Sequence, residues 1–125
     1  MDMSVFFKSV IDSDEQPVVI CDTEHTIVYM NPEAVRRYEK RGGAKLVGRS
    51  IFDCHNAHSA EIIRSVSDRF AESSDLNKIF TYHKDWNGAD SDIYMVALRN
   101  ENGEYIGYYE KHESRIHDVS KTFEV

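Results

Sequence analysis

Apolar residues recur along the chain with two different periods, and the change of period divides the chain into predicted elements. Near the N-terminus, Val5, Phe6, Val10 and Ile11 fall at helical spacing, which predicts a short amphipathic helix over residues 3–12. Two compact runs rich in β-branched residues follow, PVVICD and TIVYMN, separated by a short turn. The first part of the chain is therefore predicted to be a helix followed by a β-hairpin.

The middle of the chain carries helix signals. Asn31 can cap free amides and Pro32 suits the first helical position, so a helix is expected to begin there and to end at the glycine pair 42–43. After a short, glycine-broken stretch, a longer helix is predicted over residues 59–72, with Ser59 as its N-cap. Its apolar positions recur at spacings of three and four, at Ile62, Ile63, Val66 and Phe70.

The last third is rich in strand-forming residues. Three runs, KIFTYHKDW, SDIYMVALR and EYIGYYEKHES, have alternating or continuous apolar character. The ENG stretch at 101–103 supplies the Asn-Gly signal of a tight hairpin between the last two. Strands and helices grouped in this way predict an α+β domain, in which a five-stranded antiparallel sheet has helices packed over one face.

The length and net charge of the chain limit its domain number and the partners it can bind. A chain of 125 residues fits one domain, and we expect a helix at 3–12, a core at 16–114 and a short polar tail at 115–125. The formal net charge of −7 argues against nucleic acid and anionic membranes as partners, because both favour clusters of Lys and Arg. Two cysteines, no signal-peptide pattern and no run of roughly 20 apolar residues indicate a cytoplasmic protein.

Three stretches, taken in order, resemble a PAS domain over residues 6–114. PVVICDTEHTIVYMNPEAVRRY resembles the PAS opening that leads through Asn-Pro-x-Ala into the first helix, LVGRSIFD resembles the following Gly-Lys/Arg segment, and NGEYIGYYEKHES resembles the final strands. The resemblance implies a bacterial sensory module that holds a small molecule between sheet and helices, contacts a signalling partner protein, or dimerises through its N-terminal helix and outer sheet face. It does not imply catalysis.

The stretch FDCHNAHS is similar to one PAS subgroup, found attached to bacterial hemerythrin-like regulators. That subgroup carries Cys-His-Pro-Pro followed by Ser, which Cys54, His55 and Ser59 match, whereas Asn56 and Ala57 replace the prolines. The subgroup has no settled ligand. The similarity therefore indicates where the segment lies in the PAS fold but not what the segment binds.

The residues of this stretch leave several kinds of chemistry open. Structural zinc needs four ligands, and a second pair is missing, because His83 and His112 are expected to point outward from their strands. Some PAS domains bind haem through one axial residue, which makes His55 or His58 a candidate ligand, whereas the light-sensing flavin context is absent. Cys54 lies near a helix start, where the thiolate form is favoured, so one interpretation is a mildly redox-active thiol. The simpler interpretation is that Cys54 is a small buried hydrophobic residue just before a helix cap.

Further candidate ligand contacts come from the helices and strands around the expected cleft between sheet and helices. His55, Tyr29 and Tyr94 are candidates to point inward, and Arg36, like its neighbour Arg37 and the more distant Arg64, would meet an anionic ligand if it turned inward. No metal ligand set and no catalytic residue is predicted. The tyrosines on the other sheet face are expected to form an association surface, which the apolar stripe of the N-terminal helix would cover in a homodimer.

Overall fold

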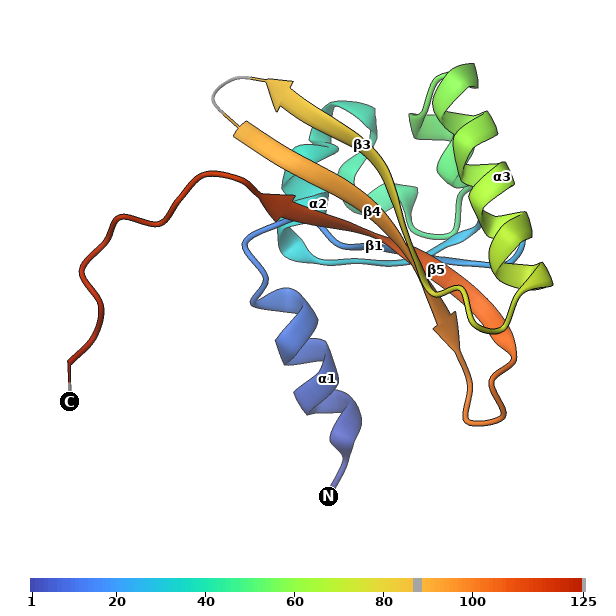
Figure 1. The fold of residues 1–125 in the computed structure, drawn as a ribbon, viewed down its shortest axis with the longest axis horizontal. Helices are drawn as coiled ribbons and strands as arrows, with labels where there is room; N and C mark the ends of the chain where they lie inside the picture. Colours follow the sequence, from blue (N-terminus) through green and yellow to red (C-terminus); the bar gives the residue numbers. More distant parts are fainter. Residues whose placement is uncertain (87–88, 125) are drawn as a thin grey trace.

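A computed structural model describes residues 1–86 and 89–124 (Figure 1). Within these residues the fold consists of five strands, three α-helices and three short 3-10 helices. In chain order the elements are α1 (Met3–Asp12), β1 (Val19–Asp22), β2 (Ile27–Met30), α2 (Pro32–Arg37), η1 (Glu39–Arg41), η2 (Gly43–Leu46), η3 (Ile51–Cys54), α3 (Ala57–Glu72), β3 (Lys78–Trp86), β4 (Ala89–Arg99) and β5 (Tyr105–Ser114).

The strands form one antiparallel sheet in the order β2-β1-β5-β4-β3. The predicted tight turn before β5 is confirmed: the side-chain oxygen of Asn100 accepts hydrogen bonds from the backbone N–H groups of Asn102 and Glu104, each at 3.0 Å. Gly103 adopts φ +80° in this turn, a conformation that costs glycine little. The turn fixes the register that places Met95 beside Glu110 and Ile93 beside His112.

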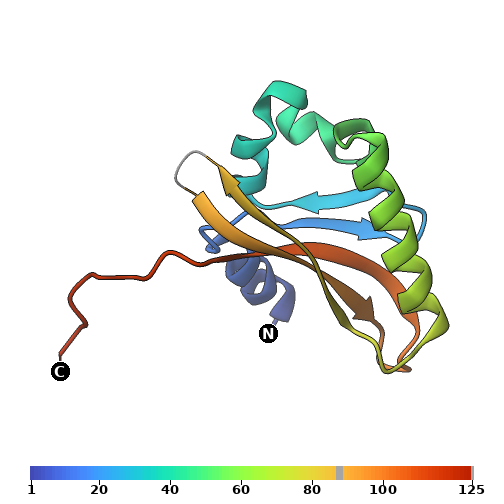
Figure 2. The ribbon, with the colours of Figure 1, turned by 45° about the horizontal axis from the view of Figure 1, so that its top comes forward.

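Helices cover the two faces of the sheet unequally (Figure 2). The segment from α2 through the 3-10 helices arches over one face and α3 runs along the same side, whereas α1 lies on the opposite side. We call the face under α2 and α3 the inner face. Strand alternation then sends every second residue of each strand towards the helices.

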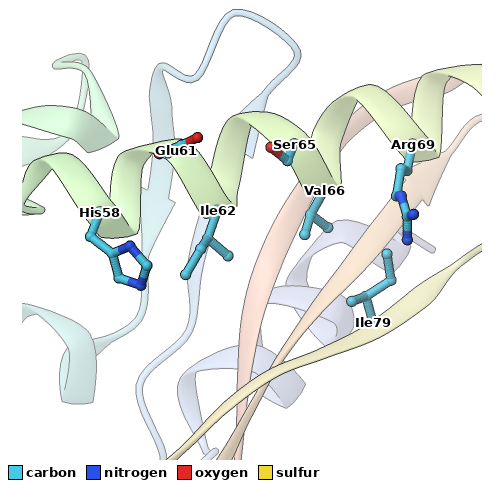
Figure 3. A pocket seen from close by; sticks show the side chains of 7 residues that line it. All are labelled: His58, Glu61, Ile62, Ser65, Val66, Arg69 and Ile79. Carbon is cyan, nitrogen blue, oxygen red and sulfur yellow. The ribbon is translucent and has the colours of Figure 1, made fainter.

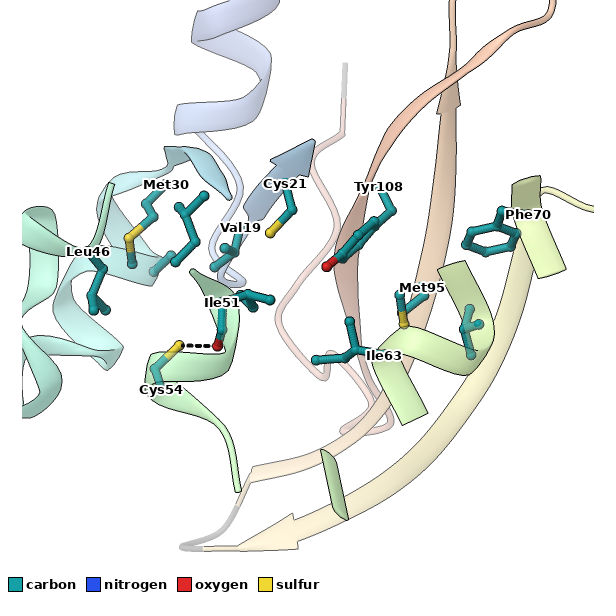
Figure 4. Packing of buried hydrophobic residues seen from close by; sticks show 13 residues of the cluster. Val19, Cys21, Met30, Leu46, Ile51, Cys54, Ile63, Phe70, Met95 and Tyr108 are labelled. Carbon is teal, nitrogen blue, oxygen red and sulfur yellow. Dashed lines mark hydrogen bonds between the residues drawn. The ribbon is translucent and has the colours of Figure 1, made fainter. Parts of the chain in front are cut away.

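The main core lies between the inner face and the helices (Figure 4). Phe70 of α3 is 0% exposed and Tyr108 of β5 is 1% exposed, and both belong to one continuous apolar cluster. Burying a side chain the size of Phe stabilises the fold by about 1.5–3 kcal/mol. The cluster also takes in Ile63 and Val66, so the helical spacing read from the sequence does describe the buried stripe of α3.

The start of α3 differs from the prediction. The N-cap is Asn56 and not Ser59, because the Asn56 side-chain oxygen accepts a hydrogen bond from the Ser59 backbone N–H at 2.8 Å. Asn and Ser are comparable capping residues, and the sequence offered both within one turn. The helix therefore begins two residues earlier and places His58 in its first turn.

Asn31 joins three elements through one fully buried side chain. Its side-chain oxygen accepts hydrogen bonds from the backbone N–H groups of Val18 and Ala34, each at 2.9 Å, which caps α2 and fixes the start of β1. Its amide nitrogen donates to the carbonyl oxygens of Ile11 at 3.1 Å and Gln16 at 3.0 Å. All four bonding positions of the amide are used, so the end of α1 is held to the first turn of α2.

The predicted fold class is confirmed, including the five-stranded antiparallel sheet and the N-terminal helix. In the part of the chain that the structure describes, no helix is both long enough and apolar enough to cross a lipid bilayer.

Candidate functional site

The inner face carries a row of polar residues on β5 where the surrounding strands are apolar. Tyr108, Glu110 and His112 alternate along β5 and face the helices. Glu110 is only 7% exposed although it carries a carboxylate, and its neighbour on β4 is the buried Met95. A buried carboxylate is costly unless it is paired, so the groups around it define the site.

Two histidines face the Glu110 carboxylate. The Nε2 atom of His55 lies 3.4 Å from one oxygen, and the Nε2 atom of His112 lies 3.9 Å from the other. Both histidine side chains are 11% exposed. His55 comes from the segment between η3 and α3, so this contact joins the helical layer to the central strand of the sheet.

The contacts of His55 determine its protonation state. Its Nδ1 atom lies 3.0 Å from the carbonyl oxygen of Ile51, and its Nε2 atom faces the Glu110 carboxylate. Because both of these oxygens are hydrogen-bond acceptors, the arrangement favours a hydrogen on each ring nitrogen, which is the imidazolium form. Burial alone would lower the pKa of His55, but its hydrogen bonds to Cys54 and Glu110, together with the charge of Glu110, raise it to about 10.

The pKa of Glu110 is shifted in the complementary direction, towards the charged carboxylate. Burial raises the pKa of the Glu110 carboxyl, but the interactions of its two oxygens with His112 and His55 outweigh burial and hold the pKa below its ordinary value. The two groups therefore form a charged pair inside the cleft.

The space around this pair falls into two parts. A small inner pocket of about 10 Å³ has room for one water molecule at most, and it is lined by His55, Ser59, Ile62, Ile63, Thr81, Tyr82, Met95 and Glu110. A larger space of about 140 Å³, which we call the mouth cavity, opens where α2 meets the ends of β4 and β5. It is lined by Pro17, Arg37, Tyr38, Lys84, Ser91, Ile93 and His112.

A third hollow lies outside the cleft, between α3 and the edge strand β3 (Figure 3). This outer groove has a volume of about 600 Å³. His58, Ile62, Val66 and Arg69 reach from the helix towards Ile79 on the strand. His58 is exposed here and does not reach the charged pair.

The fold agrees with the comparisons to known proteins. The family model described as "PAS fold" matches residues 11–111, which is most of the chain. The chain belongs to the PAS family. No curated protein sequence is similar to it at a significant level.

Solved PAS structures resemble this one throughout their length. The PAS domain of BvgS from Bordetella pertussis is 15% identical, with a TM-score of 0.63, and the match covers 95% of this chain and 90% of that one. A PAS domain from Colwellia psychrerythraea is also 15% identical, with a TM-score of 0.66 and coverage of 90% and 97%. The Aer2 receptor of Vibrio cholerae, a dual PAS-heme oxygen sensor, is 23% identical, with a TM-score of 0.55 and coverage of 80% and 94%.

These matches confirm the PAS resemblance seen in the sequence. At such identities the structural likeness establishes the fold alone. The similarity to the subgroup attached to hemerythrin-like regulators stays a prediction.

The structure brings two of the six sequence candidates to the PAS cleft. His55 forms the charged pair, and Cys54 lies beside it with its thiol donating to the Ile51 carbonyl oxygen at 3.2 Å (Figure 4). Tyr29 lies against α1 and donates a hydrogen bond to Asp12. The side chain of Arg36 is 70% exposed and pairs with Glu33, Tyr94 packs against Phe80 and Lys78 on the outer face, and His58 lines the outer groove.

Sequence reasoning missed Glu110 and assigned His112 to the wrong face. His112 points inward because it lies two and four residues after Glu110 and the buried Tyr108, and strand alternation gives all three the same face. His83 is exposed, as expected, and pairs with Asp90. The signal for Glu110 was available, because an acid in register with a buried tyrosine is unusual in a central strand.

The residues around His55 do not fit haem. Both ring nitrogens of His55 face acceptors, which leaves no free lone pair for iron, and the adjoining pocket of about 10 Å³ is far smaller than a porphyrin. Among the described side chains, no group of three or more His, Cys, Asp and Glu residues is arranged to hold a metal ion.

Proposed function

We propose that this PAS domain is a sensory signalling module that binds a small molecule in the cleft between sheet and helices. The observation that carries the proposal is the charged pair of His55 and Glu110 next to the mouth cavity. Small-molecule sites are typically mainly apolar hollows with a few convergent polar groups, and this cleft has that character. We assign no catalytic role, because the thiol of Cys54 is buried and bonded to a backbone carbonyl.

We further propose that the domain forms a homodimer through α1 and the outer face of the sheet. Four apolar residues of α1 are more than half exposed: Val5, Phe6, Phe7 and Val10. Apolar hollows of about 350 Å³ and 260 Å³ flank α1 on the outer face, next to Ile20 and Tyr109 respectively. Such a continuous apolar surface is typical of an association site.

The output of the module requires a signalling partner protein, and we propose that it reads the geometry of the dimer. A ligand changes that geometry only if it binds one arrangement more tightly than another. A bacterial, cytoplasmic setting stays a prediction.

Native mass spectrometry of the freshly purified chain tests both proposals together. A dimer with a small bound mass that is lost on mild activation would support the ligand-binding sensory function. A ligand-free dimer would favour an interaction module instead. A ligand-free monomer at every concentration would contradict both proposals.

A pair of variants locates the dimer surface. Val5→Glu and Phe6→Glu place a charge on the exposed stripe of α1, where nothing of the core is disturbed, and sedimentation velocity should then show monomer. The control is Val119→Glu, at a residue that is 89% exposed in the C-terminal tail. Dissociation by the control alone, or no dissociation by the α1 variants, would contradict the assignment.

A further inference from the structure

The walls of the mouth cavity have a composition that selects for one class of ligand. Three basic side chains reach it from three elements: Arg37 from α2, Lys84 from β3 and His112 from β5. The chain as a whole has a net charge of −7, so this concentration of basic groups is local. Such a site attracts anions.

The acid beside Arg37 does not cancel the positive charge on that side of the cavity. Glu33 is shared between Arg36 and Arg37, which leaves one positive charge over. Arg37 reaches Glu33 only through its Nε atom, at 3.1 Å, and within the described residues its terminal NH₂ groups have no hydrogen-bond partner. Glu110, behind His112, is already balanced by the imidazolium of His55.

Two hydroxyl groups lie in the same walls, those of Tyr38 and Ser91. Ser91 is 7% exposed and Tyr38 is partly buried, yet neither hydroxyl makes a hydrogen bond to any residue that the structure describes. Burial raises the pKa of the Tyr38 phenol, so the group stays a hydrogen-bond donor at neutral pH. Among the described residues, the one fully buried side-chain polar atom without a partner is Oε1 of Gln16, so these two hydroxyls are open to the cavity and can donate to a ligand that enters it.

The rest of the cavity is apolar. Pro17 and Ile93 form its remaining walls, which suit a short hydrocarbon body and offer nothing to a second anionic group. A volume of about 140 Å³ corresponds to roughly five water molecules at about 30 Å³ each. A ligand of four to six heavy atoms with one anionic end would fill it.

We propose that the mouth cavity binds a small aliphatic monocarboxylate, held at its carboxylate by Arg37, Lys84 and His112 with the hydroxyls of Tyr38 and Ser91. This inference rests on the proposed sensory function and names its ligand class. Arg recognises a carboxylate through two parallel N–H bonds, which the terminal nitrogens of Arg37 can provide. The ligand then links α2 to the strands across the cleft.

Titration of the full chain with potassium butyrate, followed by ¹H–¹⁵N NMR, tests the proposal. Butyramide, which has the same shape without the charge, and potassium chloride at equal ionic strength are the matched ligand controls. We expect saturable shifts of the backbone amides of Tyr38, Ser91 and His112 with butyrate only. Equal shifts with butyramide, tighter binding of inorganic phosphate, or no saturable shift would overturn the proposal.

Adjacent arginines supply a matched protein control. Arg37→Gln and Lys84→Gln should each weaken butyrate binding about 10-fold or more, because each removes a charged hydrogen-bond donor. Arg36→Gln should leave it unchanged, because that side chain faces solvent. Equal effects of the Arg36 and Arg37 variants would show general charge attraction and overturn the site.

The outcomes also separate this proposal from the wider one. If butyrate shows no saturable binding while native mass spectrometry finds another bound mass, the carboxylate assignment is wrong and the sensory function stands. If neither is found, both fail.

Discussion

Replacing His55 by Gln tests whether the charged pair with Glu110 stabilises the fold. Gln keeps a polar side chain of similar length but carries no charge, so the buried carboxylate would face His112 alone. Removing one partner of a buried ion pair costs about 3–5 kcal/mol. Raising the pKa of His55 from 6.5 to about 10 corresponds, at about 1.4 kcal/mol per unit, to a stabilisation of about 5 kcal/mol. We therefore expect His55→Gln to lower the free energy of unfolding by about 3–5 kcal/mol near pH 6.

The effect has a definite pH dependence. Because the folded pKa of His55 lies above its ordinary value of 6.5, its contribution is complete below pH 6.5 and is lost as the pH rises towards 10. Because the folded pKa of Glu110 lies below its ordinary value of 4.5, its contribution is present above pH 4.5 and is lost as the pH falls further. The difference between wild type and His55→Gln should be largest from pH 4.5 to 6.5.

Urea unfolding followed by far-UV circular dichroism, at pH 6 and pH 9.5, measures this difference. The matched control is His83→Gln, since His83 also faces a carboxylate but at the surface, where ion pairs contribute at most about 1 kcal/mol. A loss below about 1 kcal/mol for His55→Gln at pH 6, or an equal loss at both pH values, would refute the reasoning. Ring ¹⁵N shifts of His55 at pH 8 should independently show both nitrogens protonated.

Four further substitutions, at three places in the fold, test the scaffold by the same urea assay. Gly107→Ala should cost about 2 kcal/mol or more, because a Cβ there would lie 2.2 Å from the Cys21 carbonyl oxygen, and an unchanged midpoint would contradict this. Asn31→Asp keeps the cap of α2 but loses both donated bonds, so we expect about 2–4 kcal/mol of destabilisation and faster amide exchange at the end of α1; unchanged exchange there would argue against the tether. Asn56→Ala should cost about 1 kcal/mol and Ser59→Ala much less, and the reverse order would restore Ser59 as the cap.

Local patterns in the sequence were sufficient for the elements and the family. Alternation and the Asn-Gly turn located β4 and β5, and helical spacing located the buried stripe of α3, because each signal depends on residues that are close in the sequence. The wrong N-cap shows the limit of this reasoning. Where two capping residues lie within one turn, packing decides between them, and local sequence does not report packing.

The site depends on contacts between distant parts of the chain. His55 and Glu110 meet only because β5 lies at the centre of the sheet, and no local pattern encodes that neighbour. Arg36 and Arg37 are adjacent and chemically identical, yet one faces solvent and the other the mouth cavity. The sequence did not distinguish the two arginines, and the rotation of α2 about its axis decides which of them lines the cavity.

The hydrogen bonds of Asn31 connect α2, which lines the mouth cavity, directly to the end of α1. The side chain that caps α2, the helix carrying Arg37, also holds the Ile11 carbonyl at the end of α1. If the proposed carboxylate draws α2 towards the strands, the bonds of Asn31 would carry that movement to the end of α1. Thermodynamic reciprocity then applies: if the ligand tightens the dimer by some factor, dimerisation must tighten ligand binding by the same factor. Ligand affinity would then depend on protein concentration, so the domain would respond to its own abundance as well as to its ligand.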